Sequence, residues 1–225
     1  MEYDKNNDQI RFMHDAIDFS GKDILEIGCG NGSISTCLAK GSGSYIAIDP
    51  DPVCIEQAKQ LDTEIIFQTG TGQALNFPDN RFGLVLFTLS LHHQDSAPAL
   101  EEAFRVLKPG SHVLVVEPNA RAAFELFFNL FGDETQALEA AETAIRNSRF
   151  TLKNEDQFQV TASFENIRDL CEYDFGRELP DPADNQKILD LLCRVKNWVS
   201  PAHIPHVPID LVDELRLFLL EKPLS

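Results

Sequence analysis

The sequence is short of positive charge. It holds 19 lysine and arginine residues against 36 aspartates and glutamates, which gives its 225 residues a formal net charge of −17 at pH 7. Nucleic-acid binding draws most of its affinity from basic side chains that neutralise phosphates, so we expect no nucleic-acid partner. The acidity favours solubility and names no substrate by itself.

Long apolar runs and cysteine pairs are missing as well. No segment approaches the roughly 18 uninterrupted apolar residues of a membrane span, and the first residues, MEYDKNND, are acidic where a signal peptide is basic. The 5 cysteines are odd in number and contain no C-x-x-C pair, and no H-E-x-x-H motif occurs. We therefore expect a cytoplasmic protein with reduced thiols, no membrane span and no bound metal.

Glycine is also modest in number, but three glycines stand at alternate positions after an apolar run, in I-L-E-I-G-C-G-N-G-S-I-S from Ile24 to Ser35. This pattern predicts a buried strand that turns sharply into a helix, because glycine lacks a Cβ atom and tolerates positive φ. A ligand can then approach the backbone N–H groups. Dinucleotides, phosphates and adenosyl cofactors all use turns of this kind.

The spacing of the glycines separates these candidates. A dinucleotide fingerprint G-x-G-x-x-G that begins at Gly28 needs Gly or Ala where Ser33 stands, which weakens this interpretation without excluding it. No glycine is followed by Lys and then by Ser or Thr, so the phosphate loop is not present. The remaining pattern, E-x-G-x-G-x-G from Glu26 to Gly32, suits a cofactor without phosphate.

Strand and helix alternate through the first half of the chain. Short apolar runs predict parallel strands buried on both faces, at Asp23–Ile27, Tyr45–Ile48, Ile65–Phe67, Leu84–Phe87 and His112–Val116. We expect helices at Asp4–Phe19, Ser33–Ala39, Asp51–Gln60 and Ala97–Val106, and a turn at Lys108–Gly110. The alternation predicts an α/β fold with a doubly wound, mostly parallel sheet.

The second half of the chain has mainly helical spacing. Helices are expected within Ala120–Asn147 and near Phe164–Tyr173, Asn185–Trp198 and Ile209–Leu220, and a single strand at Gln157–Thr161. We expect residues 1–118 to form the core with an N-terminal helix, and residues 119–225 a mainly helical cap or substrate region that completes the same domain. A helical stripe of phenylalanines either packs on the core or lines an apolar lid; it consists of Phe124, Phe127, Phe128 and Phe131.

Further motifs follow the glycine turn in order. Asp49 ends the second expected strand, G-T-G-Q-A-L-N-F-P-D-N-R-F occupies 70–82, L-F-T-L-S-L-H-H-Q occupies 86–94, and R-V-L-K-P-G occupies 105–110. Together they resemble class I S-adenosylmethionine (SAM) dependent methyltransferases of the type 11, ubiquinone- and menaquinone-biosynthesis-like branch, over about Asp23 to Pro118. The resemblance implies a Rossmann-like fold closed by an antiparallel strand pair. That pair cannot be placed here, so the second half is either a helical cap or a divergent sheet edge.

The resemblance implies SAM as cofactor and S-adenosylhomocysteine (SAH) as product. Asp49 is expected beside the glycine turn, where a carboxylate can accept hydrogen bonds from ribose hydroxyls; its alternative role, capping the next helix, could equally fall to Asp51. The cofactor residues that the resemblance implies are Glu26, Gly28, Cys29, Gly30, Asn31, Gly32, Asp49, Pro50, Thr71, Gly72, Gln73, Ala74, Thr88 and Leu89. Thr71 stands where an Asp is common, and a hydroxyl accepts a hydrogen bond less strongly than a carboxylate.

His92 and His93 follow the fourth strand, where a neutral imidazole can accept a proton from the acceptor during catalysis. In the alternative interpretation, one histidine packs and the other hydrogen-bonds locally. Methyl transfer from a sulfonium is an in-line displacement that needs alignment more than covalent chemistry. We expect a SAM-dependent methyltransferase that acts on a small, partly apolar molecule. The alternatives are a SAM- or SAH-binding protein without catalysis, and a nicotinamide oxidoreductase.

Overall fold

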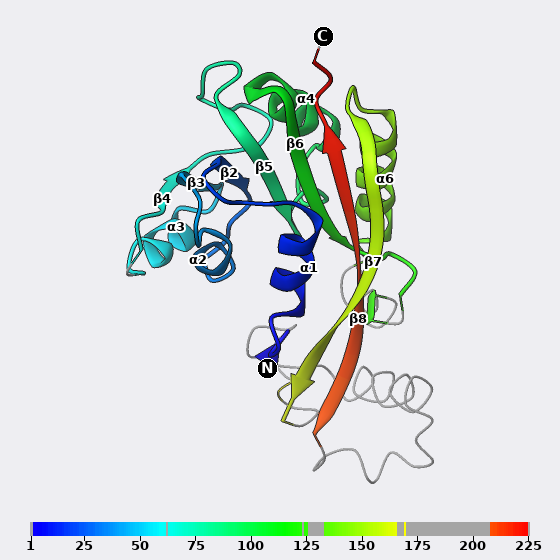
Figure 1. Ribbon diagram of the computed structural model, residues 1–225. Coiled ribbons are helices and arrows are strands. Elements are labelled where there is room, and N and C mark those ends of the chain that lie inside the picture. Colours follow the sequence, from blue (N-terminus) through cyan, green and yellow to red (C-terminus); the bar gives the residue numbers. More distant parts are fainter. Residues whose placement is uncertain are drawn as a thin grey trace. The chain divides into compact units, whose positions relative to one another are not determined.

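The structure is a computed structural model that describes residues 2–61, 63–122, 124–125, 133–165, 169 and 208–224 (Figure 1). The chain forms two compact units. The larger unit consists of Gln9–Asn119, Gln136–Phe158 and Leu215–Ser225, and the smaller unit of Met1–Asp8, Ala120–Thr135 and Gln159–Glu214. Two long strands, β7 (Thr151–Phe164) and β8 (Ile209–Glu221), contribute residues to both units.

The larger unit is built on a sheet with the strand order β7-β8-β6-β5-β2-β3-β4. Its parallel strands are β2 (Asp23–Ile27), β3 (Ser44–Asp49), β4 (Ile66–Thr69), β5 (Phe82–Thr88) and β6 (Leu107–Pro118). Strand β8 runs antiparallel to β6. The expected α/β fold with a doubly wound, mostly parallel sheet is confirmed, and each of the five strands expected in the first half overlaps an observed one.

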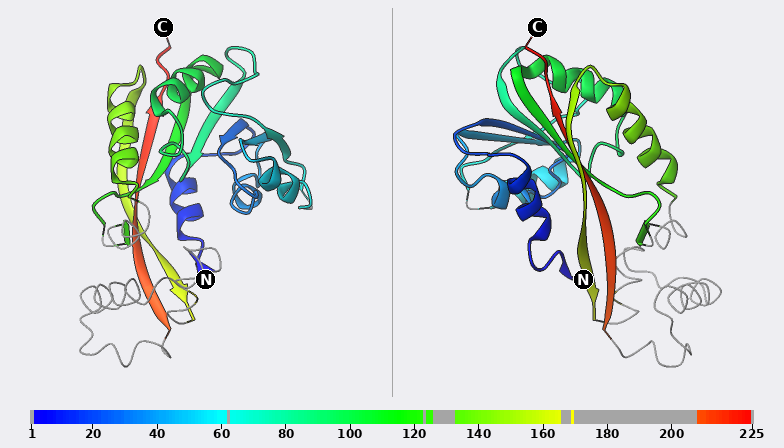
Figure 2. Two further views of the ribbon diagram at one scale, coloured as in Figure 1. Left: turned by 180° about the vertical axis from the view of Figure 1, so that it is seen from behind. Right: turned by 45° about the vertical axis from the view of Figure 1, so that its right-hand side comes forward.

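Helices cover both faces of this sheet. The chain winds outward from β2 to β4 in one direction and from β5 to β6 in the other, so right-handed crossovers place their helices on opposite faces. Apart from the first residues of α1 and α6, the described helices of the larger unit are α1 (Asp8–Ala16), α2 (Ser35–Leu38), α3 (Pro52–Ala58), α4 (Ser96–Val106) and α6 (Thr135–Asn147). Helices α4 and α6 lie side by side on one face (Figure 2).

The main hydrophobic core lies between the sheet and the pair α4 and α6. Val85 and Phe87 of β5 pack there with Leu100 of α4, Ile145 of α6 and Phe218 of β8, and all are buried. Leu84 and Leu86, which alternate with the first two residues, are also fully buried on the opposite face. This two-sided burial explains why the parallel strands appear in the sequence as short continuous apolar runs.

The segment Ile209–Leu220 is β8, so the helix expected there is wrong. Ile209, Leu211, Leu215 and Leu217 are buried in alternation with more exposed neighbours, which is the period of a strand. Buried Asp213 interrupts the apolar alternation, which is why helical spacing fitted the sequence equally well. The strand expected at Gln157–Thr161 is confirmed within the longer β7, and β7 and β8 supply the two edge strands that the sequence left unplaced.

Three other boundaries differ from expectation. The helix expected at Asp4–Phe19 is shortened to α1, because Asp4 and Asn7 have φ of 49° and 55°, and α2 is four residues long. The turn expected at Lys108–Gly110 instead lies inside β6, where the register with β5 shifts and Gly110 has φ of 76°. The glycine and proline of this segment thus mark an irregular strand rather than a chain reversal.

The smaller unit contains β1 (Glu2–Tyr3), which pairs antiparallel with β7. The Tyr3 hydroxyl donates a hydrogen bond of 2.6 Å to the Oδ2 atom of Asp213, and burial raises the pKa of this carboxyl to about 6. Phe124 is described and buried. The remaining phenylalanines of the expected stripe and the helix expected at Asn185–Trp198 lie outside the described residues.

The domain boundary expected at residue 118 stays a prediction.

None of the described helices combines the length and the apolar character that a membrane crossing requires.

Candidate functional site

A cavity of about 460 Å³ lies in the larger unit, where β2, β3 and β5 end. Its volume falls in the range of small-molecule sites, and its position is the switch point of the doubly wound sheet, where ligands of such folds bind. Thirteen residues line it: Ile27, Gly28, Gly30, Asp49, Pro50, Gly70, Thr71, Gly72, Gln73, Leu89, Ser90, His93 and Gln94.

The three glycines after β2 all have positive φ, of 83°, 54° and 78° for Gly28, Gly30 and Gly32. They serve different purposes. A Cβ atom on Gly28 would lie 2.3 Å from the Cβ atom of Ser90, and one on Gly32 would lie 2.8 Å from the Phe67 ring. A Cβ atom on Gly30 would meet nothing within 4 Å. Gly28 and Gly32 therefore allow close packing, while Gly30 leaves room inside the cavity.

Asp49 joins the glycine turn to the end of β3. Its Oδ2 atom accepts a hydrogen bond of 2.8 Å from the backbone N–H of Gly30, and its Oδ1 atom accepts one of 2.9 Å from Asp51. Asp51 itself caps α3 by accepting from the N–H of Val53 at 2.8 Å. The capping role considered for Asp49 thus belongs to Asp51, and the Asp49 carboxylate lines the cavity instead.

The loop that leaves β5 closes another side of the cavity. Leu89 has φ of 53°, a left-handed conformation that costs a non-glycine residue energy and that is concentrated at functional sites. The backbone N–H of Leu89 donates to the carbonyl of Val116 at 2.8 Å, and the Ser90 hydroxyl donates to the carbonyl of Ile27 at 2.6 Å. Hydrogen bonds to β6 and β2 therefore hold this strained loop in place.

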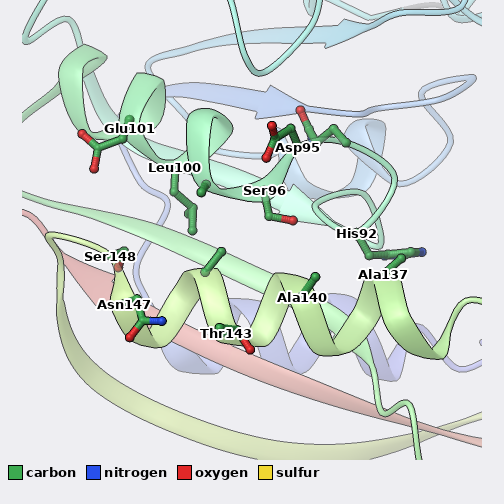
Figure 3. Close-up of a pocket in the computed structure, with 13 residues that line it drawn as sticks. His92, Asp95, Ser96, Leu100, Glu101, Ala137, Ala140, Thr143, Asn147 and Ser148 are labelled. Carbon is green, nitrogen blue, oxygen red and sulfur yellow. The ribbon is translucent and has the colours of Figure 1, made fainter.

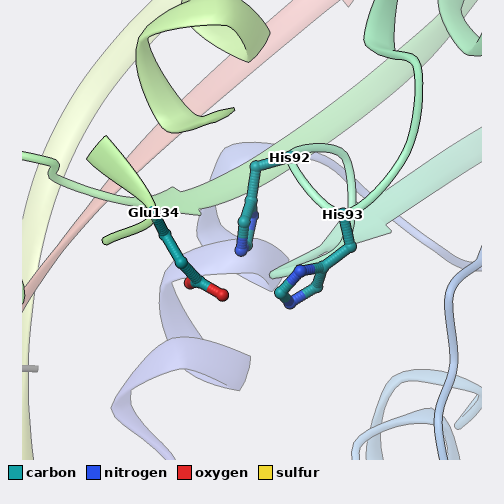
Figure 4. Close-up of side chains that lie close together, drawn as sticks. All are labelled: His92, His93 and Glu134. Atoms are coloured by element: carbon teal, nitrogen blue, oxygen red, sulfur yellow. The ribbon is translucent and has the colours of Figure 1, made fainter. Parts of the chain in front are cut away.

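The two histidines of this loop lie in different environments. Their ring centroids are 3.9 Å apart, and the ring planes form an angle of 44° (Figure 4). His93 is exposed and lines the cavity, whereas His92 is buried and its Nδ1 atom pairs with Oε2 of Glu117. The structure therefore places His93, and not His92, at the cavity wall.

His92 lines a second hollow, a groove of about 560 Å³ between α4 and α6. Figure 3 shows Ser96 and Leu100 of α4 on one side of this groove and Ala140 and Thr143 of α6 on the other. Gln94 lines both hollows, and its Nε2 atom donates to the Ser90 carbonyl at 3.1 Å. The segment from His92 to Gln94 thus borders both the groove and the cavity.

Glu26 lies beneath the glycine turn. Its Oε2 atom accepts hydrogen bonds from the Ser35 hydroxyl at 2.5 Å and the Tyr45 hydroxyl at 3.0 Å. Burial raises the pKa of this carboxyl to about 7 against the opposing effect of these two donors. Burial likewise raises the pKa of the Cys29 thiol, which argues against a nucleophilic thiolate.

Seven of the expected site residues do not line the cavity: Glu26, Cys29, Asn31, Gly32, Ala74, Thr88 and His92. Sequence reasoning also missed Ile27, Gly70 and Gln94, which line the cavity, and Glu117. The first three lie within motifs already singled out. Glu117 is the penultimate residue of β6. A carboxylate at the end of a parallel strand beside the switch point is a signal from which a role for Glu117 near the site could have been predicted.

Comparison with known proteins relates this chain to methyltransferases. Residues 25–115 match a family model described as a methyltransferase domain. A demethylmenaquinone methyltransferase from Lactococcus lactis is 33% identical over 152 residues, which cover 56% of this chain and 60% of that protein. A 2-methyl-6-phytyl-1,4-hydroquinone methyltransferase from Synechocystis is 32% identical over 125 residues, or 50% of this chain and 39% of that protein. The chain thus matches between 39% and 60% of the length of these two curated relatives.

The crystal structure of the YcgJ protein from Bacillus subtilis shares the fold, with a TM-score of 0.71 at 16% identity over 95% of this chain and 97% of that one. Fold and cavity define the class first: this is a Rossmann-like α/β protein with a cavity at the switch point of its sheet. Within that class, the match of residues 25–115 to the methyltransferase-domain model confirms the resemblance to class I SAM-dependent methyltransferases of type 11 that the motifs implied. Class I methyltransferases take the methyl group from SAM and release SAH, which confirms the expected cofactor.

Proposed function

We propose that the protein transfers a methyl group from SAM to a small, partly apolar acceptor by in-line displacement. The observation that carries the proposal is the Asp49 carboxylate, held against the glycine turn at the switch point and lining the cavity. The residues present fit this cofactor. A carboxylate can accept from both ribose hydroxyls, Gly30 leaves space for the ligand, and Pro50 offers an apolar surface to a base.

When bound, SAM supplies an electrophilic methyl group on a positively charged sulfur. The protein's residues bind, orient and exclude water. Asp49 would fix the adenosyl group, the loop from Thr71 to Gln73 would border the adenine, and Leu89 would cover the reacting end with apolar surface. His93 would accept the proton that the acceptor loses, because its imidazole is exposed at the cavity wall and a neutral imidazole can accept a proton.

The cavity and the relatives together support a proposal for the acceptor class. The part of the cavity wall assigned to the reacting end combines the apolar side chain of Leu89 with the imidazole of His93. The two curated relatives are named for demethylmenaquinone and for a phytyl hydroquinone, both of which join a ring to an apolar chain. We propose an acceptor of similar polarity. A panel of 1,4-naphthohydroquinone, catechol and phenethylamine, with SAH formation as readout, tests ring hydroxyls and an amine against one another.

The role of Asp49 is testable with a neighbour as matched control. Asp49→Ala removes the carboxylate from the cavity, whereas Asp51→Ala removes only the cap of α3, at a cost of about 1 kcal/mol of stability. Isothermal titration with SAH should show at least tenfold weaker binding for Asp49→Ala and wild-type binding for Asp51→Ala. Wild-type affinity in the Asp49 variant would contradict the proposal.

The second candidate is a protein that binds SAM or SAH without catalysis. It is favoured by Thr71, which lines the cavity where the family commonly has an acid. The two functions give different results with the same protein. SAH binding together with SAH formation from SAM and a panel acceptor supports the enzyme, whereas binding without turnover across the panel supports the second candidate.

A further inference from the structure

Glu117 makes three contacts with the loop that leaves β5. It is the penultimate residue of β6, and its side chain is 6% exposed. The Oε1 atom accepts hydrogen bonds from the backbone N–H groups of Ser90 at 3.1 Å and Leu91 at 2.8 Å. The Oε2 atom pairs with Nδ1 of His92. One buried carboxylate thus binds the backbone and the imidazole of the same loop.

These contacts bear on the proton of His92 as well as on its position. An ionised carboxylate can only accept hydrogen bonds, so the nitrogen that faces it must carry the proton whether the imidazole is neutral or charged. The His92 ring in turn packs against His93, which lines the cavity. Glu117 is therefore connected to the cavity through one intermediate ring, without lining the cavity itself.

We propose that Glu117 is a positioning residue for methyl transfer: it keeps a proton on Nδ1 of His92 and holds that ring against His93 at the cavity wall. The inference rests on the proposed function, because the placement of His93 has a catalytic consequence only if transfer occurs in this cavity. Together with the hydrogen bonds from Leu89 to Val116 and from Ser90 to Ile27, the contacts of Glu117 hold the loop while Leu89 keeps its left-handed conformation.

Glu117→Gln separates positioning from packing. The amide oxygen can still accept from Ser90 and Leu91, but the amide NH₂ then faces Nδ1 of His92. Because the amide NH₂ is a donor, Nδ1 of a neutral His92 must become the acceptor, and the ring proton moves to Nε2. Nitrogen NMR of ¹⁵N-histidine-labelled protein at pH 8 should show Nδ1 protonated in the wild type and unprotonated in the variant. SAH affinity should stay within twofold, and kcat with the fastest panel acceptor should fall at least tenfold at an unchanged KM for SAM.

A matched control exists on the same sheet. Glu221 of β8 lies 3.6 Å from Nε2 of His112, another glutamate and histidine pair, and neither residue lines the cavity. Glu221→Gln should leave the His92 signals and kcat unchanged. An unprotonated Nδ1 in the wild type, a proton that stays on Nδ1 in Glu117→Gln, or a moved proton at wild-type kcat would each overturn the inference. Failure of wild-type protein to bind SAH would instead refute the proposed function, while the NMR result would still decide the pairing of Glu117 with His92.

Discussion

At the scale of single residues, the three glycines of the turn have two different roles: two of them allow close packing, and one leaves space for a ligand. Gly28 and Gly32 approach Ser90 and Phe67 too closely for any Cβ atom, whereas Gly30 faces open space. The sequence motif marks all three glycines alike because each has positive φ. Only the contacts that surround the turn show which glycine borders the ligand.

Gly30→Ala should weaken SAH binding by tenfold or more, because the new methyl group projects into the cavity. Gly21→Ala is the control, since Gly21 also has positive φ, of 66°, with nothing within 4 Å, and lies outside the cavity. Both variants should lose about 1–2 kcal/mol of stability from the left-handed conformation. Calorimetry with SAH separates them, and equal binding in the two variants would contradict the assignment of Gly30 to the cavity.

Buried Glu26 should make stability depend on pH. Its folded pKa, raised to about 7 from an ordinary 4.5, means that the folded state favours the protonated carboxyl. This contribution is complete below about pH 4.5 and is lost as the pH rises through 7. Urea unfolding at pH 5 and pH 7.5 should show Glu26→Gln gaining on the wild type by on the order of 2 kcal/mol between the two conditions. If the stability difference between Glu26→Gln and the wild type is the same at both pH values, the fold does not raise the pKa of Glu26.

Local sequence could predict which residues gather near the site, but not which of them line the cavity. Gly28, Asp49, Gln73 and His93 were all expected there and line one cavity. Glu26 and His92 were expected alongside them, yet Glu26 lies beneath the turn and His92 beside a different groove. Which side of a strand end or loop a residue faces depends on neighbours distant in sequence, such as Glu117, 25 residues after His92.

At the scale of elements, the parallel strands were predictable and the edge strands were not. Burial on both faces makes β2, β5 and the end of β6 conspicuous as apolar runs. Strand β8 carries Asp213 at an inward position and pairs with β6, about 100 residues earlier in the chain. Local sequence does not show that this segment pairs with β6, so its spacing fitted a helix as well as a strand.

The strand character of β8 predicts a pattern of destabilisation. Phe218 and Leu220 share one face of a strand and both pack in the core with α4 and α6, whereas a helix would place them about 200° apart. Phe218→Ala and Leu220→Ala should each cost about 2–5 kcal/mol, and Val212→Ala, exposed on the same strand, less than about 0.5 kcal/mol. Urea unfolding measures all three. A negligible cost for either core residue would contradict the assigned register.

At the scale of the whole molecule, the larger unit contains every residue of the proposed cofactor cavity. The family match over residues 25–115 falls within the same unit. Cofactor binding is therefore the property on which sequence, fold and comparisons agree most closely.

The most direct test of the central claim is a thermal unfolding scan with SAM, SAH and NADH added separately. A ligand at about 100 times its dissociation constant stabilises the folded state by about 2.7 kcal/mol. For a chain of this size that corresponds to a rise in melting temperature of roughly 5–10 °C. We expect this rise with SAM and SAH and none with NADH. A transition that responds to neither SAM nor SAH, or that responds to NADH instead, would contradict the assignment of the cavity to an adenosylmethionine cofactor.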